Sequence, residues 1–168
     1  MHRLTHTVIT IIMLLWGLQA FPQQQPVVVL KADSMIITPL VWKHSSEKEQ
    51  VLTDILAHTE AFKPYTDQKI IFHGWDNNID WFRMIIRNPD TLPSTYMMLM
   101  GHNSHNESRL FQKQDTGWAN VGKAGIIYPF SQQSFPYVHH VLPITIPAGS
   151  TDTLYLKYDY RYNFKTYV

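Results

Sequence analysis

Residues 79–87 are predicted to form one long β-strand, closed by an Asn88-Pro89 turn. Side chains on a strand point alternately to its two faces. One face carries Phe82, Met84 and Ile86, and the other carries Trp81, Arg83, Ile85 and Arg87. Because a sheet commonly buries one face and exposes the other, we expect the first set to enter a core. Trp81 and Arg83 are then predicted to lie on an accessible face that a ligand can contact.

Similar short runs elsewhere predict an all-β protein. Further strands are expected at residues 27–31, 35–41, 69–73, 95–100, 108–113, 118–121, 137–146 and 153–160. Inward-facing positions are Val138, His140, Leu142, Ile144, Ile146, Leu154 and Leu156, and outward-facing positions are Tyr155, Lys157 and Asp159. Gly, Asn, Asp and Pro clusters separate the runs, as turns do. This spacing predicts a β-sandwich, specifically a jelly roll.

One helix is expected near the N-terminus. Ser46-x-x-Glu49 matches a capping box, in which side chains satisfy the free N–H groups at a helix start. An apolar stripe at helical spacing follows, and it consists of Val51, Leu52, Ile55 and Leu56. We predict a short helix over residues 47–58.

The first residues have the layout of a secretory signal peptide. Arg3 precedes an apolar run over residues 8–18, and Ala20 offers a small residue at the cleavage point. The run is shorter than the ~20 residues that a membrane-spanning helix needs. We predict a signal peptide at 1–20, a polar leader at 21–26 and one folded domain at 27–168, located in the periplasm or on the extracellular face. An uncleaved anchor or a buried helix is the alternative.

Composition excludes several classes of protein. The chain has 168 residues, a formal net charge of +1 and no cysteine. A disulfide framework, a thiolate zinc site and a cysteine nucleophile are therefore excluded. The charge balance lacks the basic patch that favours nucleic acid, so no nucleic-acid partner is expected.

Metal binding has only a weak signal. A loop contains His102, His105 and Glu107, which are residue types that bind zinc. We interpret it as a solvated hairpin loop, because three converging ligands are not evident. His139 and His140 are adjacent on a predicted strand and should point to opposite faces. No metal site and no cofactor are predicted.

Catalytic motifs are also missing from the sequence. There is no Gly-x-Ser-x-Gly elbow and no glycine-rich phosphate loop. Asp76, Asp80 and Asp115 lie in turn-rich contexts where aspartate is common. We predict that the protein is not an enzyme and assign no catalytic residue.

Aromatic residues suggest a binding function instead. The candidates for an aromatic platform are Trp75, Trp81, Trp118, Tyr128 and Tyr137. Sugar rings rest their C–H faces on flat indoles, while Arg, Asp and Asn hydrogen-bond the hydroxyls. The alternative is that these aromatics fill a sandwich core. We favour the core for Trp118 and leave Trp81 open.

Three segments together resemble a known family. They are Asp80-Trp81-Phe82-Arg83 running to Asn88-Pro89, then Pro129-Phe130-Ser131-Gln132-Gln133, then Pro143-Ile144-Thr145-Ile146-Pro147-Ala148-Gly149 running to Thr153-Leu154-Tyr155-Leu156. Their order and spacing resemble the second type of extracellular domain of bacterial seven-transmembrane receptors with diverse intracellular signalling modules (7TMR-DISM), over roughly residues 27–160. The resemblance implies a jelly roll similar to carbohydrate-binding modules, outside the cytoplasmic membrane, that senses a ligand with carbohydrate as the suspected class.

The resemblance also implies parts that this sequence does not contain. Such receptors continue into seven membrane helices and an output module, so contact with a membrane would come only through a missing C-terminal region. The chain is expected to be either a sensor domain cut from a receptor or a free periplasmic version.

We assign the predicted ligand site to the strand face around Trp81. Trp81 would stack on the ligand and Arg83 would bind its oxygens, with contributions from Arg87, Asn88 and Tyr137. The expected partner is a small molecule, with carbohydrate favoured. In the alternative, the same face docks a partner protein or forms a homodimer, because aromatics and Arg also mark binding hot spots.

Overall fold

The computed structural model describes residues 27–29, 41–65, 78–99, 105–135 and 139–161. Its strands are β1 (Val27–Val29), β2 (Trp42–Ser46), β3 (Lys63–Pro64), β4 (Ile79–Arg87), β5 (Ser94–Leu99), β6 (Glu107–Gln114), β7 (Gly117–Ala124), β8 (Val141–Ile146) and β9 (Thr151–Asp159). Its helices are α2 (Leu52–Ala57) and the short 3-10 helices η2 (Thr59–Ala61) and η3 (Phe130–Gln132). The described part of the chain is therefore mostly β-strand with one short α-helix, as predicted.

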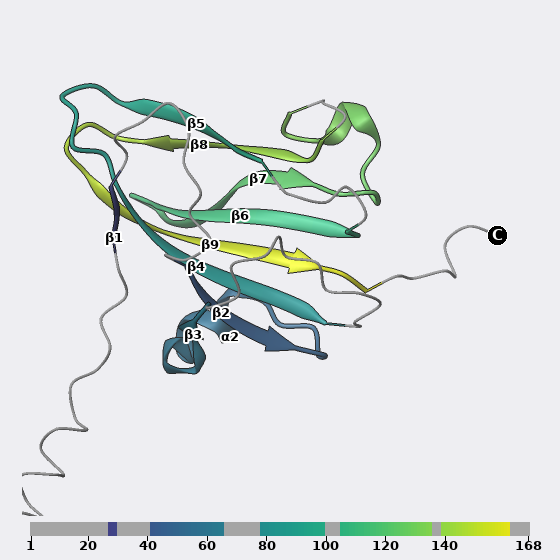
Figure 1. Cartoon of the computed structure of the whole chain (residues 1–168). Coiled ribbons are helices and arrows are strands. Elements are labelled where there is room, and N and C mark those ends of the chain that lie inside the picture. The colour runs from purple at the N-terminus through teal and green to yellow at the C-terminus, as the bar shows by residue number, and fades with distance from the viewer. Residues whose placement is uncertain (1–26, 30–40, 66–77, 100–104, 136–138, 162–168) are drawn as a thin grey trace, which may run out of the picture.

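Seven strands form one sheet and two form another. The large sheet has the order β3-β2-β4-β9-β6-β7, with β1 parallel to β4 beyond the end of β2, and the small sheet pairs β5 with β8. Figure 1 shows β5 and β8 side by side above the large sheet and α2 at its lower edge. β4 and β9 pair along their full lengths, from Ile79 opposite Asp159 to Arg87 opposite Thr151. These two strands are the centre of the large sheet.

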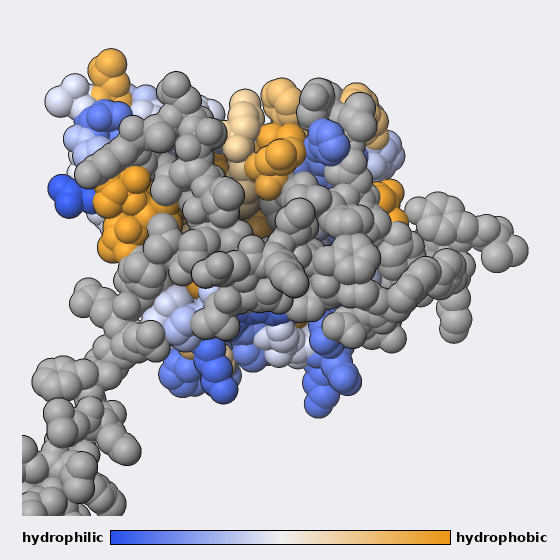
Figure 2. Space-filling view, in the orientation of Figure 1, coloured by the Kyte–Doolittle hydropathy of each residue, from blue (hydrophilic) through white to orange (hydrophobic). Residues whose placement is uncertain are grey.

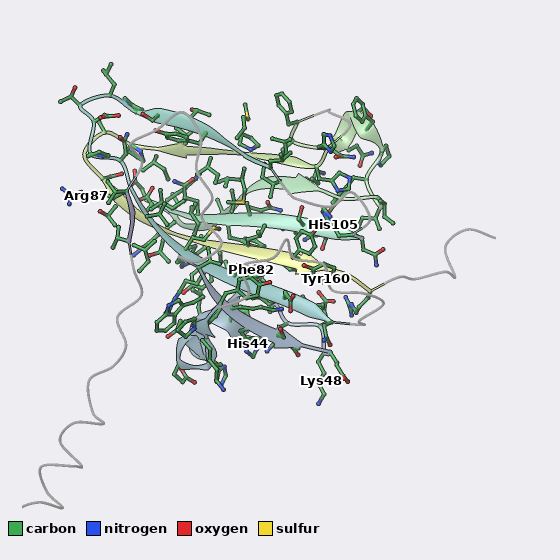
Figure 3. All side chains as sticks on the ribbon, in the orientation of Figure 1. His44, Lys48, Phe82, Arg87, His105 and Tyr160 are labelled. Carbon is green, nitrogen blue, oxygen red and sulfur yellow. The ribbon has the colours of Figure 1, made fainter. Side chains whose placement is uncertain are left out.

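The main core lies between the two sheets. Its buried side chains come from β4 (Phe82, Met84, Ile86), β6 (Leu110), β8 (Leu142, Ile144, Ile146) and β9 (Leu154, Leu156). The alternation expected for β4, β8 and β9 is confirmed here, because every inward position that lies in these strands is buried. Phe82 in Figure 3 lies within this part of the sheet.

A second core covers the opposite face of the same sheet, which we call the α2 face. Ile55 of α2 and Phe62 pack there on Ile79, Trp81 and Tyr155. The expectation that Tyr155, Lys157 and Asp159 point to solvent is wrong, since all three are buried. A period of two gives the side of the sheet on which a residue lies, but not whether another segment covers that side.

The helix begins later than the capping box predicted. Val51 precedes the first helical residue, and its N–H donates to the Asp54 carboxylate over 3.2 Å. The Ser46 hydroxyl instead accepts a hydrogen bond from the Lys48 N–H at 3.1 Å, before the helix begins. Ser46 belongs to β2, a strand that the sequence pattern did not reveal.

Other sequence predictions are settled only in part. The strands expected at 95–100, 108–113, 118–121 and 153–160 are confirmed within a few residues, and the last part of 137–146 forms β8. Segments 35–40 and 69–73 lie outside the described residues. The sandwich-like arrangement is confirmed, while jelly-roll connectivity stays a prediction. Within the described ranges, no helix has the length and hydrophobicity needed to cross a membrane.

Candidate functional site

Trp81 is buried under α2 and is not accessible. Its side chain is 1 % exposed, and its ring stacks on Phe111 with ring centroids 5.7 Å apart. Ile55 of α2 and Phe62 belong to the same cluster. The prediction that Trp81 lies on an open face is therefore wrong, because the helix that precedes β4 in the chain folds back over that face.

Arg83 lies on the same face, at the border of this cluster, and is only half-buried. Its guanidinium carbon is 4.9 Å from the centroid of the Trp42 ring and 5.4 Å from that of Phe62. Such distances are those of cation–π contacts. Arg83 also hydrogen-bonds Tyr155, whose pKa is raised by burial despite the opposing effect of the nearby guanidinium. Packing therefore holds the guanidinium beside the partly exposed Trp42 indole.

A pocket of about 390 Å³ lies next to this cluster, at the edge where β2 and β3 pair. Its lining residues are Lys43, His44, Ser45, Ala61, Lys63, Pro64 and Tyr65. His44 connects the pocket to the α2 face, because its ring lies 5.9 Å from that of Phe62. In Figure 2, hydrophilic residues gather along the lower edge of the molecule, where Figure 1 places α2, β2 and β3.

A buried carboxylate holds the pocket's polar wall in place. Asp80 is almost fully buried on the side of β4 opposite to Trp81. It accepts a hydrogen bond of 2.5 Å from the Ser45 hydroxyl and forms an ion pair of 2.8 Å with the Lys43 ammonium. These contacts fix two hydrogen-bonding side chains at the wall of the pocket.

Charged residues occupy the other end of the α2 face. Glu107 accepts a hydrogen bond from the Tyr128 hydroxyl, is 2.7 Å from the Arg109 guanidinium and is 3.4 Å from the Lys157 ammonium. Burial alone would raise the pKa of Glu107, but these donors and cations outweigh it and hold the pKa below its usual value. Glu107 is therefore ionised at neutral pH.

The Glu49 carboxylate joins this network from the segment before α2. It binds both the Lys157 ammonium and the Arg161 guanidinium. Burial would raise the pKa of Glu49, but the two cations outweigh burial and lower it. Arg161 also pairs with Asp159 at 2.7 Å.

The other predicted site residues do not gather with Arg83. Arg87 is exposed at the far end of β4 and projects away from the sheet (Figure 3). Asn88 is fully buried in the following turn, where its amide donates to the carbonyls of Leu92 and Ile146 over 2.9 and 3.1 Å. Asn88 is thus a structural residue of the turn. Tyr137 lies outside the described residues.

Two histidines form a buried pair elsewhere in the fold. The Nδ1 atoms of His105 and His140 are 3.3 Å apart, and His105 Nε2 is 3.2 Å from the Ser108 hydroxyl. The inward position predicted for His140 is confirmed. Among the described residues, no three His, Cys, Asp or Glu side chains are grouped so that they could hold a metal ion.

Sequence reasoning missed several residues of this face. Trp42 lies in β2, which has no strong strand pattern, so nothing in the sequence pointed to its side of the sheet. Glu49 and Lys157 are 108 positions apart, and no motif relates them. For Lys157, the sequence indicated only that its side chain lies on the face of β9 opposite to that of Leu156.

Comparison with known proteins gives one finding. A search of curated proteins found no match. The sequence model of the family described as 7TMR-DISM extracellular 2 matches residues 43–165, which include α2, β4, β9 and all of β2 except Trp42. The resemblance drawn from the sequence is confirmed. The chain belongs to the 7TMR-DISM extracellular 2 family, and it is an extracellular sensor domain of a receptor.

Proposed function

We propose that this sensor domain binds a carbohydrate, without catalysing a reaction, at the accessible border of the α2 face. The observation that carries the proposal is the Arg83 guanidinium held 4.9 Å from the centroid of the partly exposed Trp42 ring, next to the pocket of β2 and β3. An indole offers a flat apolar surface to the C–H face of a sugar, and a guanidinium carries five hydrogen-bond donors for its oxygens.

The adjoining pocket extends around the β2 edge and adds polar groups from both faces of the sheet. His44 lines it on the α2 face, whereas Lys43 and Ser45, fixed by Asp80, line it on the opposite face. Small-molecule sites typically combine apolar surface with a few fixed polar groups. Export by the predicted signal peptide at residues 1–20 would bring this site to ligands outside the cytoplasm.

The test is the binding of a glycan panel to the purified protein and to two matched arginine variants. Arg83→Met is expected to weaken binding of the best glycan by about tenfold or more, because hydrogen bonds to charged groups contribute about 1.5–3 kcal/mol. Arg87→Met, at the exposed far end of the same strand, is expected to bind normally. Circular dichroism of both variants shows whether each is folded. The absence of any bound glycan, or equal binding by both variants, would contradict the proposal.

A second candidate function is a protein–protein contact through β5. Met97 and Leu99 point outward from this strand and are 54 % and 63 % exposed. Apolar side chains of this size at an accessible strand favour contact with another protein or a second copy. Concentration-dependent dimerisation together with an inert glycan panel would support this function instead.

A further inference from the structure

One exposed carboxylate binds two cations that lie more than a hundred positions away in the chain. Glu49 is 52 % exposed, whereas its partners are less so: the side chain of Lys157 is 9 % exposed and that of Arg161 is 33 % exposed. Lys157 lies in β9, and Arg161 follows the end of that strand. The segment before α2 therefore reaches the charged end of the sheet, where the Glu49 side chain contacts it.

The two cations have other partners that hold them in place. Lys157 is 3.4 Å from Glu107, and Arg161 donates from Nε to Asp159 Oδ1 over 3.0 Å. Glu107 and Asp159 are both buried. Lys157 and Arg161 would thus keep their positions if Glu49 moved away, and Glu49 is the exposed partner of the set. A site whose cations are fixed and whose anion is exposed is arranged for exchange of that anion.

Buried polar atoms next to this contact lack partners. Trp81 lies directly opposite Lys157 in the β4–β9 register, so the two share the α2 face. The Trp81 Nε1 donor and the Gln50 Oε1 acceptor are both buried with no hydrogen-bond partner among the described residues. Buried polar groups without any partner are rare and costly, and such atoms are usually satisfied by an ordered water, an ion or a ligand.

We propose that Glu49 occupies a carboxylate-binding site, and that the carboxylate of an acidic sugar displaces it to bind Lys157 and Arg161. This inference rests on the proposed carbohydrate-binding function and specifies its class of ligand. Arg83 lies two positions from Trp81 along the same face, about 7 Å at the rise of a strand, but the buried indole and α2 separate it from the charged end, so the acidic sugar occupies a subsite distinct from Arg83.

The local charge favours a single negative charge on the ligand. Without Glu49, the cations Arg109, Lys157 and Arg161 face the carboxylates Glu107 and Asp159, so three positive charges meet two negative ones. The site is then +1, and a monoanionic carboxylate neutralises it. A dianionic phosphate would leave an excess negative charge beside two buried carboxylates, which is unfavourable. A uronic acid therefore fits better than a sugar phosphate.

The test uses the full chain and four defined sugars. Glucuronate and galacturonate are titrated by calorimetry against glucose and galactose, with the unsubstituted protein, Glu49→Gln and Glu47→Gln. Glu49→Gln removes the internal competitor, so it is expected to bind a uronate at least about tenfold more tightly than the unsubstituted protein does. Glu47 is an exposed carboxylate two positions earlier, and its variant is expected to bind as the unsubstituted protein does.

A second variant checks the cation side of the site. Arg161→Gln is expected to lower uronate affinity about tenfold or more, because it removes one of the two cations that bind the carboxylate. Lys157 stays in place, and Arg161 is partly exposed, so the variant is expected to fold. Equal uronate affinity in Glu49→Gln and Glu47→Gln would overturn the inference. If the protein preferred the neutral sugars, and Arg83→Met abolished that binding, the inference about Glu49 would be overturned while the proposed carbohydrate-binding function would stand. No binding of any sugar would overturn both.

Discussion

Trp81 fills the space between the sheet and the segments that cover it. The indole stacks on Phe111 at 5.7 Å and belongs to a cluster with Ile55 of α2. A side chain this large and this buried contributes to the packing of several elements at once. Trp81 therefore packs β4, β6 and α2 against one another.

Replacing Trp81 tests that packing directly. Trp81→Ala is expected to lower the free energy of unfolding by about 3–5 kcal/mol, because it removes buried apolar surface and leaves a cavity. Urea denaturation followed by circular dichroism measures the change. Phe130→Ala, in an aromatic side chain that is 55 % exposed, is expected to change it by less than about 0.5 kcal/mol. An unchanged unfolding curve for Trp81→Ala would show that the indole is not part of a core.

Arg83 and Trp81 show what strand alternation predicts at the residue scale. Alternation placed both on one side of β4, and the structure agrees. Alternation did not show that other segments cover this side of β4. The covering residues Ile55 and Phe62 belong to a helix and a loop that precede the strand in the chain. Accessibility is decided by contacts between distant segments, whereas alternation reports only the local backbone.

At the scale of elements, one glycine controls how β7 ends. Gly125 follows β7 with a φ of +135°. A Cβ atom at this position would lie 2.2 Å from the backbone oxygen of Asn106, which is too close for any side chain. The N–H groups of Ile126 and Ile127 donate to the carbonyls of His105 and Asn106 over 3.2 Å each. The chain after β7 is thus hydrogen-bonded through its backbone to the two residues that precede β6.

Comparing Gly125 with Gly149 distinguishes the steric clash at Gly125 from the strain that a positive φ causes by itself. Gly149 also has a positive φ, of +63°, but a Cβ atom there meets nothing within 4 Å. Gly149→Ala is expected to cost about 1 kcal/mol, which is the usual penalty for a left-handed alanine. Gly125→Ala is expected to cost clearly more, because strain and a backbone clash combine. Thermal unfolding of the two variants measures the difference, and equal melting temperatures would contradict the close approach at Gly125.

Most strands could be predicted from the sequence, while α2 and β2 were the weak points. β4 matches its predicted bounds of 79–87, because the strand ends where the Asn88-Pro89 turn begins. The Ser46 capping motif misplaced the start of the helix, since Ser46 pairs with Ile79 as the last residue of β2. A local motif is overridden when its first residue is needed in a sheet.

At the scale of the whole molecule, a charge network connects the segment before α2 with β6 and β9. Its carboxylates Glu49 and Glu107 both have lowered pKa values, because the hydrogen bonds and cations around them outweigh burial. A carboxyl whose folded-state pKa lies below its unfolded value stabilises the fold above the unfolded pKa. That stabilisation is lost as the pH falls through the folded-state pKa.

The fold is therefore expected to weaken in acid. The free energy of unfolding should fall as the pH is lowered below about 4.5, the ordinary pKa of a glutamate. Glu107→Gln should be less stable than the unsubstituted protein at pH 7 and should show a flatter decline below pH 4.5. Urea titrations at several pH values measure both effects, with Glu47→Gln as the exposed control. A decline of the same steepness in Glu107→Gln would rule out Glu107 as its source.

None of this network was evident in the sequence. The pairs Glu49–Lys157 and Glu107–Lys157 join residues that are 108 and 50 positions apart. Such pairs depend on strand order in the sheet, which places β9 beside both β4 and β6. Composition and spacing predicted the β class and the family, but the ion contacts of the candidate site required the arrangement of strands.

The position of β9 also governs when the protein can assemble. Among the described residues β9 is the last strand in chain order, yet it lies between β4 and β6, which have no direct pairing with each other. Until residue 159 has been added, the two halves of the large sheet share no backbone hydrogen bonds across their centre. The growing polypeptide is thus kept from closing its large sheet before the residues of β9 have been added.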